Sequence, residues 1–147
     1  MNLHVFLNPV RDNETKEIVV SDRFIERDEQ GNPILDEKGN TIPFKFKIRA
    51  LKQEESAALL KAATSRKKDR SGNIVEERDI EKYTRALVVA ATVNPDFSNK
   101  ALCDAFGVLD PLMVPGKMLY VGEYATLSAA IQEICGLDVD EGEEAKN

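Results

Sequence analysis

The chain has 147 residues, of which 42% are hydrophobic and 31% charged, a composition that suits an ordinary soluble protein with one hydrophobic core. Its formal net charge of −6 argues against a nucleic-acid binder, which needs a basic surface to contact phosphates. No apolar run approaches the about 20 residues of a membrane span, and the first residues lack the features of a signal peptide, so we expect neither membrane contact nor export.

The N-terminal third of the chain favours an arm followed by strands. Residues 1–17 combine a short apolar stretch with a polar one, which predicts a loosely held N-terminal arm. Residues 17–25 are rich in β-branched side chains and favour a strand. Residues 41–49 give the clearest pattern, because apolar side chains alternate with basic ones. Such alternation is typical of a strand with one face on a core and the other in water.

A short motif, Asp-x-x-Gly-Asn, occurs at residues 28–32, 36–40 and 69–73. In each copy the Asp side chain can open a turn, and the Gly can take the positive φ that the turn requires. The first two copies leave room for one short strand near residues 32–35 and so predict a three-stranded meander. Calcium binding is the alternative, but the positions that would need acidic ligands hold Gln30 and Lys38.

From residue 52 onwards the periodicity is helical. Residues 53–64 favour a helix with acidic side chains in its first turn. We interpret the basic cluster at 66–70 as a solvated loop between two helices. Asp79 is a good N-cap, and the helix that it opens is expected to be buried over residues 86–93, where the sequence is apolar nearly all round.

Further helices are expected after the Asn-Pro pair at 94–95. Ser98 is predicted to cap a short helix over residues 99–106, which Gly107 would end. Residues 108–119 are interrupted by Pro and Gly, and a last helix is expected to run to about Cys135 and to stop at Gly136.

These patterns predict an α+β fold, in which a small antiparallel β-meander of two or three strands precedes a bundle of four or five helices. We expect a single domain over residues 18–137, with the meander at 18–51 and the helical part at 52–137. Residues 138–147 hold five acidic side chains and one Lys without apolar periodicity, and we expect a disordered acidic tail there.

The residues needed for most kinds of chemistry are missing. The chain has one His and two Cys, too few for the usual four-ligand zinc site, and Cys103 and Cys135 fall at apolar helix positions where buried thiols are expected. It contains no phosphate-binding Gly-rich loop and no G-x-S-x-G or H-E-x-x-H motif. We therefore predict no catalytic, metal or cofactor-binding residues and no enzymatic activity.

A helix-turn-helix is the sharpest rival interpretation. Residues 99–108 look like the opening of such a motif, and residues 110–119 would then be the recognition helix. Pro115 and Gly116 interrupt that segment, and Lys117 is its only basic side chain. Both features count against a DNA-contacting helix, but the alternative of a small acidic regulator, either helix-turn-helix-like or a DNA mimic, stays open.

Three stretches of the second half carry a family resemblance. Residues 82–97 end in Val-Asn-Pro-Asp-Phe, residues 99–107 hold Leu and Phe ahead of a Gly, and residues 117–136 contain Lys-Met-Leu, Gly-Glu-Tyr and a closing Gly. In order and spacing they resemble the XkdN-like tail assembly chaperones of phages and PBSX-type prophages. The similarity covers about residues 18–137.

The resemblance implies a non-catalytic chaperone that binds the phage tape measure protein and assists polymerisation of the tail tube protein. It also implies a place in the cytoplasm of the infected or lysogenic bacterium, and absence from the mature virion. A candidate partner-binding surface is the cluster around the interrupted segment, because Met adapts to varied partners; its members are Met113, Met118, Leu119, Tyr120 and Tyr124. The alternative, that these side chains complete the helical core, stays open.

Overall fold

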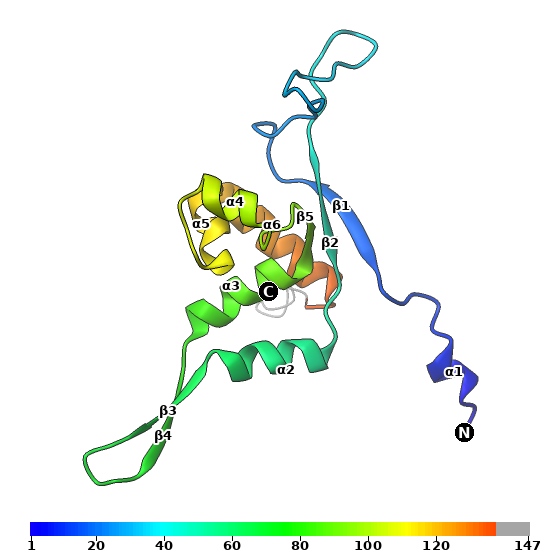
Figure 1. The fold of residues 1–147 in the computed structure, drawn as a ribbon. Coiled ribbons are helices and arrows are strands. Elements are labelled where there is room, and N and C mark those ends of the chain that lie inside the picture. Colours follow the sequence, from blue (N-terminus) through cyan, green and yellow to red (C-terminus); the bar gives the residue numbers. More distant parts are fainter. Residues whose placement is uncertain (138–147) are drawn as a thin grey trace, which may run out of the picture.

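The computed structural model describes residues 1–137, and its fold confirms the predicted α+β class (Figure 1). A three-stranded antiparallel sheet has the order β1-β2-β5, where β1 is Thr15–Val19, β2 is Lys45–Arg49 and β5 is Thr92–Asn94. The alternation predicted for the second strand is confirmed, since Phe46 and Ile48 of β2 are buried while Lys45 and Lys47 are exposed. The central strand thus supplies two side chains to the core.

The long connection between β1 and β2 contains the two predicted turns. In each, the leading Asp accepts backbone N–H bonds of 2.9 Å from residues two and four positions later. Gly31 and Gly39 have φ values of 85° and 82°, as the motif requires. The middle strand expected at 32–35 does not form, because only single bridges join Arg27 to Pro33 and Leu35 to Thr41. Pro33 has no N–H with which to continue a ladder.

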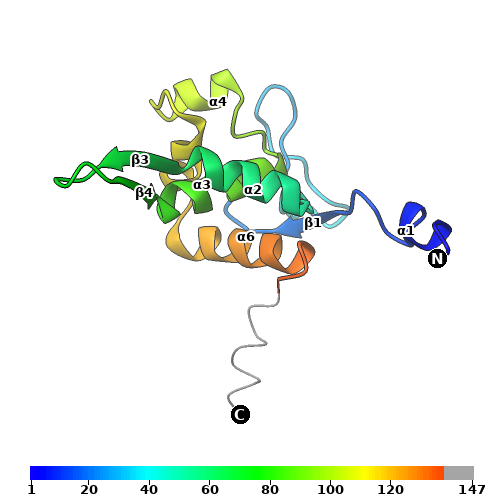
Figure 2. The same ribbon diagram turned by 90° about the horizontal axis from the view of Figure 1, so that it is seen from below.

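The basic cluster at residues 66–70 was wrongly interpreted as a loop. It belongs to a hairpin in which β3 (Thr64–Lys68) pairs with β4 (Ile74–Arg78) across the third Asp-x-x-Gly-Asn turn. Both strands are exposed almost throughout. A strand with no buried face needs no alternation of apolar and polar residues, and the sequence therefore lacked the pattern by which a strand is usually predicted. Figures 1 and 2 show this hairpin standing out from the body of the molecule.

Helix α2 (Gln53–Ala62) leads into the hairpin, and α3 (Ile80–Ala91) follows it. Asp79 caps α3 as predicted, since its carboxylate accepts a 3.0 Å bond from the N–H of Lys82. The prediction that helix extends to residue 93 is wrong. Thr92 turns the chain into β5, with its hydroxyl bonded to the carbonyl of Val88 at 2.7 Å, and the strand gains hydrogen-bonding partners on β2.

Four short or medium elements complete the chain: α4 (Lys100–Ala105), the 3-10 helix η1 (Pro111–Met113), α5 (Val114–Met118) and α6 (Val121–Ile134). The cap of α4 is Asn99 rather than Ser98, because the Asn99 side chain accepts from Leu102 N–H at 3.2 Å. Gly107 and Gly136 take positive φ values where the helices were predicted to end. The segment 110–119 splits into η1 and α5, so it offers no continuous recognition helix.

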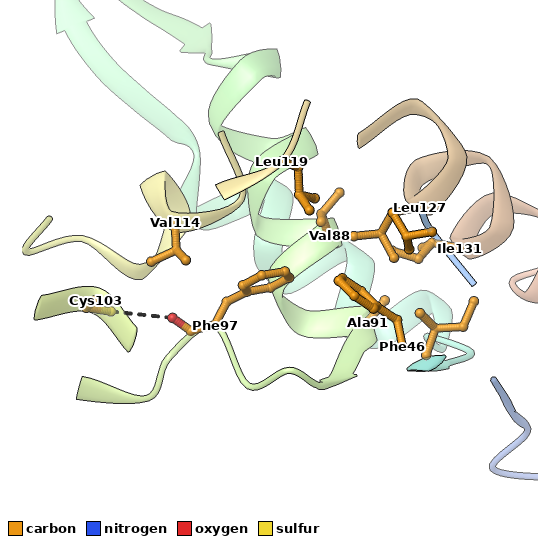
Figure 3. Close-up of a cluster of buried hydrophobic side chains, with 11 residues drawn as sticks. Phe46, Val88, Ala91, Phe97, Cys103, Val114, Leu119, Leu127 and Ile131 are labelled. Atoms are coloured by element: carbon orange, nitrogen blue, oxygen red, sulfur yellow. Dashed lines mark hydrogen bonds between the residues drawn. The ribbon is translucent and has the colours of Figure 1, made fainter. Parts of the chain in front are cut away.

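The core lies between the sheet and helices α3, α5 and α6. Figure 3 shows Phe46 and Phe97 meeting side chains of α3 and α6, and both rings are fully buried. Cys103 is buried there and its thiol donates to the Phe97 carbonyl at 3.4 Å, while Cys135 is half-buried at the end of α6. The remaining members of the buried cluster are Val20, Ile48, Val88, Ala91, Val114, Leu119, Leu127 and Ile131.

The segment before β1 contains a single helical turn near its start, α1 (His4–Leu7), in which every side chain is exposed. Because β1 already begins at Thr15, the segment outside the sheet is shorter than the arm predicted over 1–17. The predicted acidic tail over 138–147 lies outside the described residues. Across the described part, no helix is long and apolar enough to cross a membrane.

Candidate partner-binding surface

The corner between α5 and α6 is built by local sequence signals. Pro115 occupies the first turn of α5, where its missing N–H costs nothing, so the Pro that interrupts the predicted helix instead starts a short one. Leu119 and Tyr120 are extended, and α6 begins at Val121. Glu123, in the first turn of α6, accepts a 2.7 Å bond from the N–H of Tyr120 and so fixes the entry to the helix.

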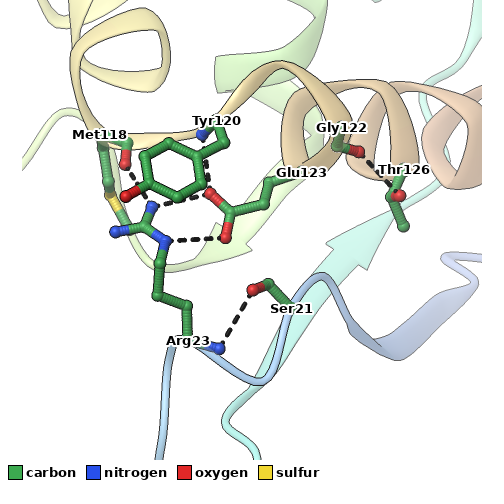
Figure 4. Close-up of polar contacts among 7 residues, drawn as sticks. All are labelled: Ser21, Arg23, Met118, Tyr120, Gly122, Glu123 and Thr126. Atoms are coloured by element: carbon green, nitrogen blue, oxygen red, sulfur yellow. Dashed lines mark hydrogen bonds and ion pairs between the residues drawn. The ribbon is translucent and has the colours of Figure 1, made fainter.

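Arg23, from the connection between β1 and β2, holds this corner against the body. Its guanidinium donates to both Glu123 oxygens at 2.7 and 3.0 Å and to the Met118 carbonyl at 2.9 Å (Figure 4). The guanidinium carbon also lies 4.0 Å from the centre of the Tyr120 ring and 4.6 Å from that of Phe24. The hydrogen bonds from Arg23 lower the pKa of Glu123 to about 2, against the opposing effect of burial.

A groove runs between the first turns of α3 and the α5–α6 corner, with a volume of about 460 Å³; we call it the α3–α6 groove. Ile80 and Val121 stand at its edges with 58% and 90% of their surfaces exposed, and Leu119 forms part of its floor. Tyr124 lies against them, and burial raises the pKa of its hydroxyl. The other lining residues are Glu81, Thr84, Arg85 and Gly116.

The five side chains predicted from the sequence do not form one patch. Leu119 and Tyr124 line the α3–α6 groove, although Leu119 is only 8% exposed and also belongs to the core. Met118 lines a smaller hollow of about 260 Å³ beside the β1–β2 connection. Tyr120 is exposed and covers Arg23, and Met113 is partly exposed on η1. The core interpretation therefore holds for Leu119, and the groove becomes the better-defined candidate surface.

Two residues of the groove were missed by sequence reasoning. Ile80 was not among the predicted partner-binding residues, yet it is exposed in the first turn of α3. Val121 was not among them either, yet it is exposed as the first residue of α6. An apolar side chain directly after a helix cap is the one local signal that both positions share, since they follow the caps Asp79 and Tyr120.

The groove has the chemistry of a binding surface. Its ionisable side chains include Glu81 and Arg85, which form an exposed ion pair at 3.5 Å along one edge. Among residues 1–137 no group of three or more His, Cys, Asp or Glu side chains is placed to hold a metal ion. An apolar floor at Leu119, with exposed apolar side chains at the edges and a charged pair beside them, suits a partner that brings an apolar side chain into the groove.

Comparison with known proteins decides the family. A family model described as phage XkdN-like tail assembly chaperone protein matches residues 3–146. The chain belongs to this family. The family predicted from residues 82–136 is thereby confirmed, and the match extends beyond them to the N-terminal arm. A phage tail assembly chaperone of this kind works with phage tail proteins.

Two relatives from Bacillus subtilis strain 168 support the assignment. This chaperone is 33% identical to the phage-like element PBSX protein XkdN over 148 residues, which covers 97% of this chain and 92% of that protein. It is 34% identical to the protein YqbN over 128 residues, covering 86% and 78% of the two chains. The crystal structure of YqbN matches the fold with a TM-score of 0.67 at 28% identity, over 94% of this chain and 98% of that one.

Proposed function

We propose that this tail assembly chaperone binds the phage tape measure protein and assists polymerisation of the tail tube protein around it, without catalysis. It acts in the cytoplasm of the infected or lysogenic bacterium and is absent from the finished virion. Membership of the tail assembly chaperone family supports this proposal. The observation that supports the contact surface is the α3–α6 groove, where Ile80 and Val121 expose apolar surface that no other side chain among residues 1–137 covers.

The groove suits a chaperone because of its size. A chaperone has to bind apolar segments of its partner and then release them as assembly proceeds. A pocket of about 460 Å³ accommodates a few apolar side chains, and small interfaces of less than about 1,200 Å² are typical of transient complexes. The formal net charge of −6 on the whole chain favours solubility of the complex while the partner is held.

The test is co-purification after co-expression with the tape measure and tail tube proteins of the same phage or prophage. The variant carries Ile80→Glu and Val121→Glu, which place charges in the groove. Both positions are more than half exposed, so the thermal unfolding of the variant should match that of the wild type. Leu109→Glu is the matched control, since Leu109 is fully exposed and lies outside the groove.

We expect the wild type and the Leu109→Glu control to recover the tape measure protein, and the folded groove variant to lose it. If the wild type recovers neither tail protein, the proposed function is wrong. If the groove variant recovers as much tape measure protein as the control, the function stands but the groove is not the contact surface.

A further inference from the structure

The N-terminal end of the chain carries apolar surface that is exposed in the part of the chain that the structure describes. We call residues 1–10 the apolar arm. Its side chains Leu3, Val5, Phe6 and Leu7 are all more than half exposed, with Phe6 at 67% and Leu7 at 70%. The hydrogen bonds of the arm are local, joining residues 2 to 8 within and around the single turn α1. A helix this short is not stable alone in water, so the arm needs a surface to pack against.

The arm is tied to the body just behind this segment. Asp12 forms an ion pair of 3.4 Å with Lys52, and the carbonyl of Glu14 accepts a 2.9 Å bond from the N–H of Ala50. The free part of the chain therefore begins near Arg11, and its reach is limited to about 3.3–3.6 Å per residue.

The arm and the α3–α6 groove lie at opposite ends of the molecule. Figures 1 and 2, which are related by a 90° turn, both place α1 at one end and the β3–β4 hairpin at the other. The groove is beside the hairpin, because Ile80 on its edge lies only two residues after the end of β4. An arm that points away from its own groove is placed to meet the groove of another copy.

We propose that the apolar arm of one copy fills the α3–α6 groove of a second copy. The two surfaces match in character, since apolar arm side chains would meet Ile80, Leu119 and Val121. Charge does not oppose the contact, because residues 1–10 hold no acidic side chain and the groove edge carries the Glu81–Arg85 ion pair. Each copy would use both its arm and its groove, so that both exposed apolar surfaces would be buried in the assembly.

Contacts between opposite ends are head-to-tail, and such contacts extend into rings or filaments instead of stopping at a dimer. The arm would also compete with the apolar partner segment of the proposed function, so that free chaperone keeps its groove covered until the partner displaces the arm. This competition rests on the proposed function, whereas the self-association does not.

The experiment is sedimentation velocity of the purified full chain over a range of concentrations. The wild type should form species larger than a dimer that return to monomer on dilution. A variant lacking residues 1–10 and the groove variant Val121→Glu should each remain monomeric. Mixed together, these two variants have one intact arm and one intact groove per pair, so they should form a two-chain complex that does not grow further.

Two charge-matched controls accompany the variants. Asn8→Asp adds a charge to the arm without removing an apolar side chain, and Leu109→Glu replaces an exposed apolar side chain of the body outside the groove with a charged one; both should behave as the wild type. A photoreactive residue in place of Phe6 should cross-link to the peptides that contain Ile80 or Val121 of a second chain.

A wild type that is monomeric throughout, an armless variant that still assembles, or cross-links that map elsewhere would each overturn the proposal. These results are separable from the fate of the proposed function. A monomeric wild type that recovers the tape measure protein overturns the arm contact alone. An assembling wild type that recovers no tail protein overturns the proposed function alone.

Discussion

Arg23 and Glu123 stand 100 positions apart in the chain, yet they form a two-point ion pair with N–O distances of 2.7 and 3.0 Å. Glu123 is almost fully buried, and the same carboxylate also accepts the N–H of Tyr120. The pair joins the irregular β1–β2 connection to the first turn of α6, next to the α3–α6 groove. It is therefore the polar contact that links the two halves of the fold at the candidate surface.

Arg23→Ala should destabilise the protein, because it leaves the carboxylate of Glu123 buried without its charged partner and also removes the stacking on Tyr120. The urea unfolding midpoint should fall clearly below that of the wild type. Lys100→Ala, which breaks the exposed pair with Asp104, is the control and should change the free energy of unfolding by less than about 1 kcal/mol. Equal effects of the two substitutions would show that the Arg23 contact adds nothing to the fold.

The same pair predicts an acid-dependent loss of stability. The pKa of Glu123 falls from 4.5 to about 2 on folding, so the folded state binds the proton less readily than the unfolded state. The stabilisation is complete above the unfolded value and is lost as the pH falls from 4.5 towards 2. The difference in unfolding midpoint between the wild type and Glu123→Gln should therefore shrink over this interval. A difference in unfolding midpoint that stays constant from pH 4.5 down to about pH 2 would contradict the prediction.

Two glycines make a matched test of backbone conformation. Gly107 ends α4 with φ of 66°, and a Cβ there would meet no other atom, so Gly107→Ala should cost about 1–2 kcal/mol through the left-handed backbone alone. Gly122 lies in α6 with equally open space around it, and Gly122→Ala should stabilise by up to about 1 kcal/mol. Denaturant unfolding measures both, and effects of the same sign would refute the conformational explanation.

Substitution of two phenylalanines, one in the core and one in the arm, should affect stability very differently. Phe97 is fully buried between α3 and the α4–α5 region, and Phe97→Ala should lower the free energy of unfolding by about 3–5 kcal/mol. Phe6 is the same residue type in the exposed arm, and Phe6→Ala should change the stability of the monomer by less than about 0.5 kcal/mol. Thermal unfolding at low protein concentration distinguishes the two. A large loss at Phe6 would mean that the arm packs on its own body.

Local chemistry decided which parts of this fold were predictable. The three Asp-x-x-Gly-Asn turns were predicted correctly because a turn depends on one carboxylate and one glycine that are neighbours in sequence. The strand β5 was missed because its partner, β2, lies about a third of the chain away, and pairing overrode a helical apolar pattern.

The candidate surface was predictable only in part for the same reason. Leu119 and Tyr124 were found because they adjoin an obvious break at Pro115, but the sequence could not place them on different sides of the corner from Met118 and Tyr120. Nor could it separate a half-buried Tyr124 from an exposed Val121, since burial depends on where α3 packs against α6. The groove is formed by residues of α3, α5 and α6 together, so it depends on how these helices pack.

The β3–β4 hairpin should be dispensable for folding. Its strands are exposed throughout except at Thr64, and its cross-strand contacts include the surface pairs Arg66–Glu76 and Lys67–Glu77 at 3.4 and 3.0 Å. Ser65 and Glu77 are directly paired, so an Asn-Gly turn can join them in place of residues 66–76. The shortened chain should keep its free energy of unfolding within about 1 kcal/mol of the wild type. A larger loss, measured by urea unfolding, would show that the hairpin packs on the body and that its exposed Ile74 and Val75 are not free for a partner.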